Sequence, residues 1–310
     1  MTSAAARFAV VTALAASAAG CGLGPGASSS GTATLTVTRD YGSKTLVSAS
    51  QDDPPSSETV IRFLDDEAEI STRYGGGFVQ SINGLAGTGS SDWFFYVNGT
   101  ESPVGSADVH VNGGDRIWWD YRDWSGAMSV PAVVGAWPEP FAQASSDRPK
   151  PAAVECADVH SACEIAKSRL AAVGARATIT DGTAGNATPR LLVGTWTRVR
   201  RDPAVDAFRG GPASNGVFAT FKGSVREDRW HLIGLDPSGT PARDFGTRAG
   251  LVAALGRAGA PQTWIVTGSG AGAVRRAAKD LSGRRLRSRY AIAALPWKAA
   301  PLPILRRGGS

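Results

Sequence analysis

Hydrophobic and polar residues alternate over 32–38 in the pattern of a half-buried β-strand. A turn at 41–43 and a second short apolar run over 44–48 predict a hairpin. Residues 59–70 then carry apolar side chains at helical spacing, which predicts an amphipathic helix. A strand pair, a helix and further strands is the element order of a β-grasp-like domain.

Two later segments, 93–99 and 116–121, are predicted strands that are rich in aromatic residues. Side chains alternate between the two faces of a strand. One face holds Trp93, Phe95, Val97, Ile117, Trp119 and Tyr121, and the other holds Phe94, Tyr96, Asn98, Trp118, Asp120 and Arg122. We expect one aromatic face to pack on the helix. The other either lies beneath the apolar segment 128–141 or forms an exposed binding patch.

An exposed aromatic patch of this kind would hold a flat, partly apolar ligand by stacking and burial. Asn98 and Asp120 would supply polar contacts at the edge of that ligand. The candidate ligand-binding residues are therefore Trp93, Phe94, Tyr96, Asn98, Trp118, Asp120 and Trp124.

Apolar segments of helical and strand length alternate in the second half of the chain. The expected helices cover 157–173, 195–208, 246–257 and 271–281, and the expected strands cover 190–194, 216–222, 229–236, 262–267 and 289–295. Interleaved helices and strands predict a separate α/β or α+β domain. The expected fold class is therefore α+β, with a β-grasp-like N-terminal domain followed by this second domain.

The distribution of charge supports the same division. Residues 31–141 carry 6 Lys or Arg and 15 Asp or Glu, whereas residues 142–310 carry 26 and 12. Opposite net charges favour two domains that attract one another. The predicted domains cover 32–141 and 156–310, with a linker at 142–155.

The first 20 residues have the pattern of a secretory signal peptide, in which the apolar stretch 8–19 is too short to span a bilayer core of about 30 Å. The sequence Ala-Ala-Gly-Cys that ends at Cys21 resembles a bacterial lipobox, which predicts a lipid on Cys21. Residues 21–31 would then be a flexible tether. These features predict a protein anchored to the extracytoplasmic face of the cell membrane; the alternative is plain secretion.

Cys156 and Cys163 lie seven residues apart, and an oxidising compartment favours a disulfide between them. On a continuous helix their Cα atoms would be roughly 10 Å apart, which is too far for a bridge. A disulfide therefore requires the helix to begin only after about His160. The alternative is two free buried thiols. Three cysteines and three histidines are too few for a multi-cysteine zinc site, and no metal site is expected.

Several ordered motifs between positions 59 and 121 resemble a known family. They are the segments 77–84, 93–99, 104–105 and 114–121. Together they resemble the transcobalamin-like C-terminal domain, which in transcobalamin and intrinsic factor closes over one face of cobalamin. A related set of bacterial surface lipoproteins carries the same module. The resemblance implies a β-rich fold and, as ligand, a corrinoid or another flat small molecule.

Motifs for catalysis and for nucleotide binding are weak or missing in the sequence. The sequence contains no nucleophile elbow, no H-E-x-x-H motif and no Walker loop. Residues 268–273 fit G-x-G-x-x-A, but the required acidic residue about 20 positions later is missing, so we expect only a tight turn. An extracytoplasmic location argues against nucleic acid as the partner of the basic run 275–289. We expect no enzyme and no cofactor.

We therefore expect a lipid-anchored, extracytoplasmic, non-catalytic binding protein. The resemblance suggests an accessory component of cobalamin or related vitamin uptake, working beside a transporter or another envelope protein. The alternative is a structural or protein-interaction module of the envelope that binds no small molecule.

Overall fold

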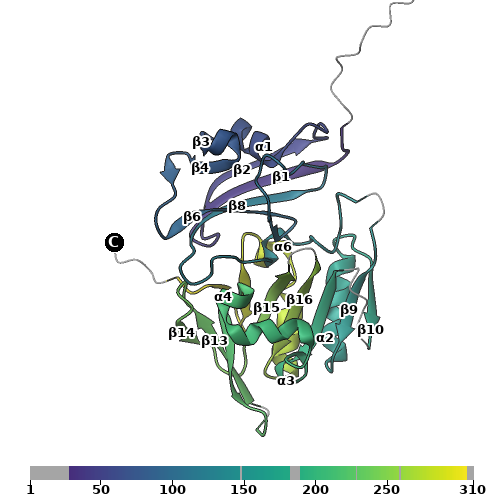
Figure 1. Cartoon of the computed structure of the whole chain (residues 1–310). Coiled ribbons are helices and arrows are strands. Elements are labelled where there is room, and N and C mark those ends of the chain that lie inside the picture. The colour runs from purple at the N-terminus through teal and green to yellow at the C-terminus, as the bar shows by residue number, and fades with distance from the viewer. Residues whose placement is uncertain (1–27, 147–148, 182–188, 228, 258–259, 306–310) are drawn as a thin grey trace, which may run out of the picture.

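The computed structural model describes residues 28–146, 149–181, 189–227, 229–257 and 260–305. The predicted signal peptide, Cys21 and most of the predicted tether lie outside the described residues. Figure 1 shows two domains in contact, with the N-terminal domain above the C-terminal one. Both are mixtures of helices and strands, so the predicted α+β class is confirmed. Among the described residues, no helix is long and apolar enough to cross a membrane.

The first domain is built on a five-stranded sheet in the order β2-β1-β8-β6-β7. Its strands are β1 (Thr32–Arg39), β2 (Lys44–Asp52), β6 (Ser91–Val97), β7 (Thr100–Glu101) and β8 (Arg116–Asp123). The central strands β1 and β8 are parallel, and the other neighbours are antiparallel. Helix α1 (Val60–Glu67) follows the first hairpin and packs on one face of the sheet. This is the predicted β-grasp arrangement.

Helix α1 begins where the Thr59 side chain accepts a hydrogen bond from the Arg62 N–H. Its apolar residues at helical spacing are buried against the sheet, as predicted. The helix ends at Glu67, earlier than expected, because Ile70 pairs with Ile82 in a small second sheet. That sheet consists of β3 (Ile70–Arg73), β4 (Phe78–Ile82) and β5 (Leu85–Ala86), with the short 3-10 helix η1 (Tyr74–Gly76) between the first two strands.

The end of the predicted tether is attached to the first domain. The Gly31 N–H donates to the Asp53 carboxylate at 2.8 Å, and the Ser29 hydroxyl accepts from the Gly113 N–H at 3.0 Å. Residues 28–31 are therefore not part of a flexible tether.

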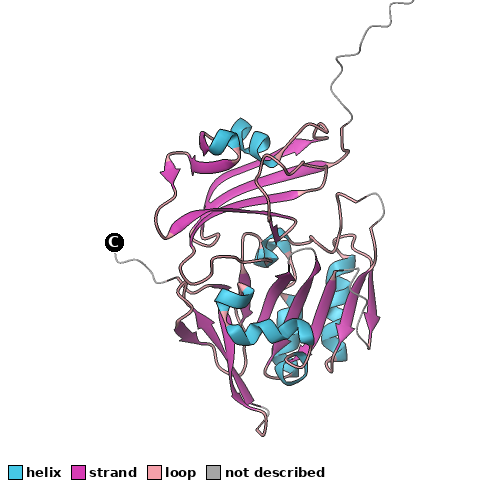
Figure 2. Ribbon diagram, in the orientation of Figure 1, coloured by secondary structure: helices cyan, strands magenta, loops and turns pink. Residues whose placement is uncertain are grey.

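The second domain is built on a seven-stranded sheet in the order β10-β9-β11-β16-β15-β17-β18. These strands are β9 (Ala152–Cys156), β10 (Ala177–Thr180), β11 (Arg190–Thr195), β15 (Gly250–Arg257), β16 (Ala260–Gly268), β17 (Ala291–Ala294) and β18 (Ala299–Leu302). The first four strands in this order are parallel, and the remaining pairs are antiparallel. Figure 2 shows helices on both faces of this sheet.

Both faces of the seven-stranded sheet are buried. Helices α2 (His160–Ala171) and α5 (Ala271–Lys279) cover one face, together with Trp137 and Phe141. The opposite face packs on α3 (Trp196–Val199), on the 3-10 helix η3 (Pro203–Gly210) and on a three-stranded sheet. That sheet is β12 (Ala219–Ser224), β13 (Arg229–Leu235) and β14 (Pro241–Asp244); the short elements η2 (Val134–Ala136), α4 (Pro212–Asn215) and α6 (Gly283–Leu286) lie in connections.

Some boundaries differ from the expectation, each for a physical reason. Residues 250–257, expected as a helix, form strand β15, whose alternate side chains are buried in the two cores on either side of the sheet. A strand that is buried on both faces is a continuous apolar run, which periodicity cannot distinguish from a buried helix. The helix expected over 195–208 is split in two, because Pro203 cannot continue α3. The linker expected at 142–155 overlaps β9, whose side chains belong to the second core.

Candidate functional site

The two aromatic strands of the first domain pair as the alternation predicts. β6 and β8 are antiparallel neighbours, with Phe95 opposite Trp119 and Tyr96 opposite Trp118. The face that holds Phe95 and Trp119 packs on α1. The face that holds Tyr96 and Trp118 points away from α1, toward the second domain.

This second aromatic face is buried, and so it is not an open binding patch. Tyr96 is 0% exposed and Trp118 4%. They belong to an interdomain cluster, which we define as Tyr41, Tyr96, Trp118, Ala127, Val130, Val133, Phe218, Ile233, Leu235 and Tyr290. The sequence left open whether this aromatic face is covered by other parts of the chain or forms an exposed patch. The structure shows that it is covered. The segment after β8 covers part of the face, and Tyr290 of the second domain covers more of it, with its ring 5.2 Å from that of Trp118. Too little of either ring is exposed for a ligand to stack on it while the domains are together.

A buried polar network runs through the interdomain cluster. The Asp120 carboxylate accepts hydrogen bonds from the Thr38 hydroxyl at 2.6 Å, the Gly42 N–H at 3.0 Å and the Tyr290 hydroxyl at 2.9 Å. The Trp118 indole donates to Thr38 at 2.8 Å. Burial raises the pKa of Asp120 to about 6, although its three hydrogen bonds act in the opposite direction. One of these three donors belongs to the second domain, so the network joins the two domains.

Arg122 is the other charged group on this face, and its side chain is fully buried. Its guanidinium donates to the carbonyls of Ala127 at 2.7 Å and Met128 at 3.0 Å, and to the Glu101 carboxylate at 3.4 Å. It also lies over the Phe94 ring, 3.7 Å from the ring centroid. Arg122 therefore fixes the segment that covers the aromatic face.

The seven residues predicted to bind a ligand have different positions and do not form one site. Trp93 is on the α1 side of the sheet, and its indole donates to the Leu85 carbonyl at 2.9 Å. Asn98 occupies the β6–β7 turn, where its side chain bonds Asp115 and the Arg116 N–H. Trp124 is half-buried just after β8. The remaining four, Phe94, Tyr96, Trp118 and Asp120, lie in or against the interdomain cluster.

Hydrogen bonds and one close backbone approach also connect the two domains. The Gln262 amide of β16 donates to the Asn98 carbonyl at 3.2 Å and to the Thr100 hydroxyl at 2.7 Å. On the opposite side of the interface, the Arg289 guanidinium donates to the Gly42 carbonyl at 3.2 Å. The backbones are so close that a Cβ on Gly42 would lie 2.0 Å from the Ser288 carbonyl oxygen. Glycine is therefore required at this contact.

A groove of about 380 Å³ remains open beside this contact. The first domain contributes hydroxyl side chains from the outer face of β1 and β2, together with Arg116 of β8. The second side of the groove comes from η2 and from Arg287 and Ser288, which follow α6. The groove is lined by Thr34, Leu35, Thr36, Thr45, Ser48, Ala49, Ser50, Arg116, Ile117, Trp118, Gly135, Ala136, Arg287 and Ser288. We call it the interdomain groove.

Several polar side chains that line the interdomain groove have no partner among the residues that the structure describes. In the described part of the chain, the hydroxyls of Thr34, Thr36, Ser48 and Ser50 make no hydrogen bond, and Arg116 and Arg287 form no ion pair. Burial lowers the pKa of Arg116; the Glu139 carboxylate opposes this shift, and the charge on Arg287 adds to it. The positive charges of Arg116 and Arg287 therefore repel each other across the groove. No carboxylate is among the described lining residues.

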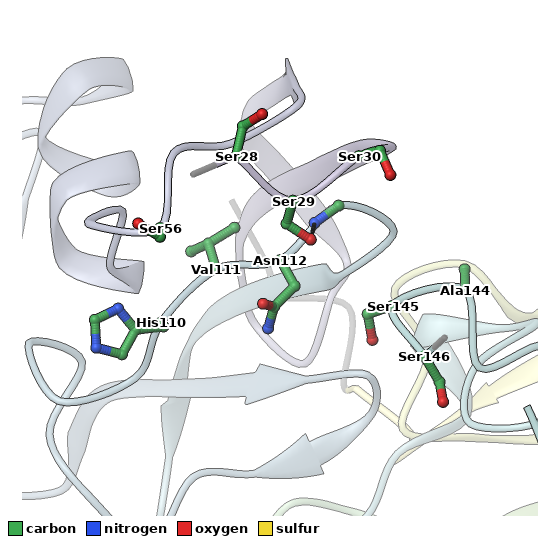
Figure 3. Close-up of a pocket in the computed structure, with 11 residues that line it drawn as sticks. Ser28, Ser29, Ser30, Ser56, His110, Val111, Asn112, Ala144, Ser145 and Ser146 are labelled. Atoms are coloured by element: carbon green, nitrogen blue, oxygen red, sulfur yellow. Dashed lines mark hydrogen bonds between the residues drawn. The ribbon is translucent and has the colours of Figure 1, made fainter. Parts of the chain in front are cut away.

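A second, larger hollow of about 600 Å³ lies where the described chain begins. Figure 3 shows Ser28, Ser29 and Ser30 on one side of it, Asn112 in its middle and His110 at its edge. Its described lining residues include no Asp, Glu, Lys or Arg. Hydroxyls and one imidazole supply no fixed charge to hold an ionic ligand, so the interdomain groove is the stronger candidate.

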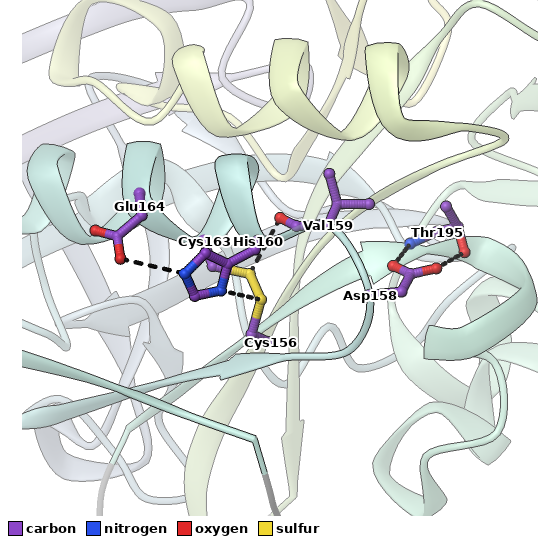
Figure 4. Close-up of a disulfide and its surroundings, with 7 residues drawn as sticks. All are labelled: Cys156, Asp158, Val159, His160, Cys163, Glu164 and Thr195. Atoms are coloured by element: carbon purple, nitrogen blue, oxygen red, sulfur yellow. Dashed lines mark hydrogen bonds and ion pairs between the residues drawn. A yellow bond between two sulfur atoms is a disulfide. The ribbon is translucent and has the colours of Figure 1, made fainter.

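The predicted disulfide between Cys156 and Cys163 is present, with Cα atoms 5.8 Å apart. Cys156 ends β9, and α2 begins only at His160, as the distance argument requires. Figure 4 shows the His160 ring beside the bridge and directed at Glu164, 3.7 Å away on the exposed surface. Among the residues that the structure describes, no group of three His, Cys, Asp or Glu side chains could hold a metal ion.

Residues 57–123 match the family model described as Domain of unknown function (DUF4430). No curated protein matches the chain. The DUF4430 segment runs from just before α1 to the end of β8, and so includes both aromatic strands and Arg116. It is compatible with the transcobalamin-like resemblance over 59–121 and does not by itself establish it.

Proposed function

We propose that this protein is a lipid-anchored, non-catalytic binding protein of the extracytoplasmic membrane face, and that its ligand occupies the interdomain groove. The observation that supports this proposal is the groove itself, because it is lined by unpartnered hydroxyls and by two arginines from the two domains. A preformed concave site with a few convergent polar groups is the usual form of a small-molecule site.

The transcobalamin-like resemblance supports a binding role in which the β-grasp domain supplies one wall of the site and another domain supplies the second. In this chain the second wall would come from η2 and from the residues after α6. Stacking of a corrinoid on Tyr96 and Trp118 is not part of the proposal, since Tyr290 already packs on these rings.

The anchor is tested by replacing Cys21 with alanine. Lipidation of Cys21 should hold the wild-type protein in the membrane pellet, because a lipid chain adds about 0.8 kcal/mol for each buried CH₂ group. The Cys21→Ala variant should be found in the soluble fraction or remain unprocessed. If the variant fractionates with the membrane as the wild type does, the lipid-anchor part of the proposal is wrong.

The binding role is tested by filling the groove. Ser48 is an exposed residue of β2 whose side chain lines the groove, so Ser48→Trp should block it. Wild-type protein purified from its own membranes should release a small molecule on denaturation, as detected by mass spectrometry, and the variant should release much less. Thr178→Trp is the matched control, because Thr178 is an exposed strand residue outside the groove lining.

Equal amounts of the released molecule from Ser48→Trp and Thr178→Trp would reject the groove as the binding site. If no molecule is released from any of the three proteins, the envelope-interaction alternative becomes the better explanation.

A further inference from the structure

We propose that the interdomain groove recognises a phosphate group, with Arg116 and Arg287 as its charged ligand-binding residues. This inference rests on the proposed function and names the chemistry of its ligand. It is carried by the charged and hydroxyl side chains that line the groove.

Arg116 is unusual among the basic residues of the first domain. That domain is acidic, and Arg122 on the same strand is paired with Glu101. Arg116 is half-buried, yet it has no carboxylate within 4 Å among the described residues. Its side chain instead lines the groove. A half-buried guanidinium that forms no ion pair with any described carboxylate is well suited to an anionic ligand.

Arg287 brings a second positive charge to the same groove from the other domain. The two guanidiniums repel each other, and an anion placed between them would replace this repulsion by two attractions. The Glu139 carboxylate attracts Arg116 but forms no ion pair with it among the described residues. The Glu139 carboxylate accepts from the N–H groups of Gln143 and Ala144, and Asp115 bonds Asn98 and Asn112.

The hydroxyl groups favour phosphate over carboxylate as that anion. The register places Thr34 beside Ser50 and Arg116, and Thr36 beside Ser48 and Trp118, so that hydroxyls and a guanidinium form rows across three strands. A planar carboxylate is satisfied by one guanidinium fork, whereas a tetrahedral phosphate presents oxygens in several directions. Two guanidiniums and four hydroxyls that approach from two domains match the second geometry.

The volume of the groove indicates which phosphate compounds could fit in it. A volume of about 380 Å³ is within the range of sites that hold an organic ligand, about 300–1,000 Å³. It has room for a phosphate together with a small polar body. Inorganic phosphate and an organic phosphate are therefore the two sources that the experiment has to separate.

The experiment is isothermal titration calorimetry of the purified full chain with inorganic phosphate and, separately, with glycerol 3-phosphate. The ionic strength is kept constant because screening changes any charge-dependent affinity. We expect saturable binding of at least one probe. Arg116→Gln and Arg287→Gln should each weaken it about tenfold or more, the usual effect of losing a hydrogen bond to a charged group.

Arg275→Gln is the matched control, because Arg275 is an exposed arginine of α5 outside the groove and the substitution removes the same charge. It should leave the affinity within about twofold of wild type, as expected for one screened surface charge. Thr36→Val, which replaces a hydroxyl by a methyl group of the same shape, should weaken binding by several-fold. Circular dichroism melting curves identify any variant that has lost its fold.

Tighter binding of glycerol 3-phosphate than of inorganic phosphate would support the site and assign an organic phosphate to it. Equal affinities would support the site and show that the phosphate group alone is recognised, whereas tighter binding of inorganic phosphate would assign the free ion. If neither probe binds saturably, or if the two groove variants bind as tightly as Arg275→Gln, the phosphate inference is wrong. Should Ser48→Trp nevertheless lose the co-purifying molecule, the proposed function would stand with a different ligand chemistry.

Discussion

Replacing Arg122 with methionine is expected to lower the free energy of unfolding by about 3–5 kcal/mol, the range measured when one partner of a buried ion pair is removed. Methionine has a similar length but no donor, so the carbonyls of Ala127 and Met128 lose their hydrogen bonds. Glu101 loses its positive partner while most of its side chain stays buried. The two carbonyls are left desolvated without these donors, whereas Glu101 keeps its hydrogen bonds from the Ser129 hydroxyl and the Val130 N–H.

The destabilisation caused by Arg122→Met should extend to the domain interface, because Arg122 fixes the segment that covers Tyr96 and Trp118. Val130 and Val133 of that segment belong to the interdomain cluster. We therefore expect the interface of Arg122→Met to become exposed first, at a low urea concentration. Tryptophan fluorescence monitors this unfolding. The wild type should unfold in a single transition that begins at a higher urea concentration.

Arg39→Met is the matched control for this prediction. Arg39 lies on the neighbouring strand β1, but its side chain is 40% exposed and its ion pair with Asp40 is at the surface. Exposed pairs of this kind contribute about 0–1 kcal/mol. Equal losses in the two variants, or a loss below about 1 kcal/mol in Arg122→Met, would show that Arg122 does not hold the interface together.

The first domain could be predicted closely because its pattern is local. Residues 32–38 alternate with period two, and Val60, Phe63 and Leu64 recur at helical spacing, so the faces of these elements are determined by neighbours in the sequence. The division of the aromatic strands into two faces follows from the same alternation. The bridge between Cys156 and Cys163 follows from an oxidising compartment, and the distance between the two residues then requires α2 to begin only at about His160.

The partner of the second aromatic face could not be predicted in the same way. The hydrogen bond between Tyr290 and Asp120 joins residues 170 positions apart, and no local pattern indicates it. The sequence indicates the segment 128–141 as a candidate cover, but it places Tyr290 only in an expected strand over 289–295. Aromatic residues on an apparently open face therefore do not distinguish a ligand site from a domain interface.

The interdomain groove was missed for a related reason. Its hydroxyl residues were visible in the sequence, since Thr34 and Thr36 alternate with the buried residues of β1. The polar side of such an alternating strand usually faces solvent, so the pattern by itself does not indicate a site. The groove forms only where η2 and the residues after α6 lie opposite this side. A threonine-rich outer face beside an unpaired arginine is the signal that would have found it.

The stability of the interface should depend on pH through Asp120. The folded-state pKa of this carboxyl is raised to about 6 by burial, whereas in the unfolded chain the pKa is about 3.9. The folded state therefore binds more protons than the unfolded state between these two values. The contribution of Asp120 is fully present below about pH 4 and is lost as the pH rises through about 6, which amounts to roughly 3 kcal/mol at most.

Asp120→Asn isolates this contribution from the other carboxyl groups. Burial raises the pKa of Glu139 and Asp280, whereas the pKa of Asp202 is lowered despite burial by its hydrogen bonds from Arg190 and Ala204. These groups are unchanged in the variant and cancel when it is compared with the wild type. The asparagine oxygen can still accept from Thr38 and Gly42, and the Tyr290 hydroxyl can turn to accept from the new amide.

We expect Asp120→Asn to be more stable than the wild type at pH 7.5, because it no longer buries a charge, and to lose this advantage as the pH falls toward 4.5. The measurement is the urea midpoint of both proteins at several pH values in this range. Arg122 and the tyrosines at positions 41, 96 and 290 are the ionisable groups around Asp120, and neutral tyrosines do not change charge in this range. Parallel pH profiles of the two proteins would mean that Asp120 is already ionised in the folded state at pH 4.5, with Arg122 compensating its burial.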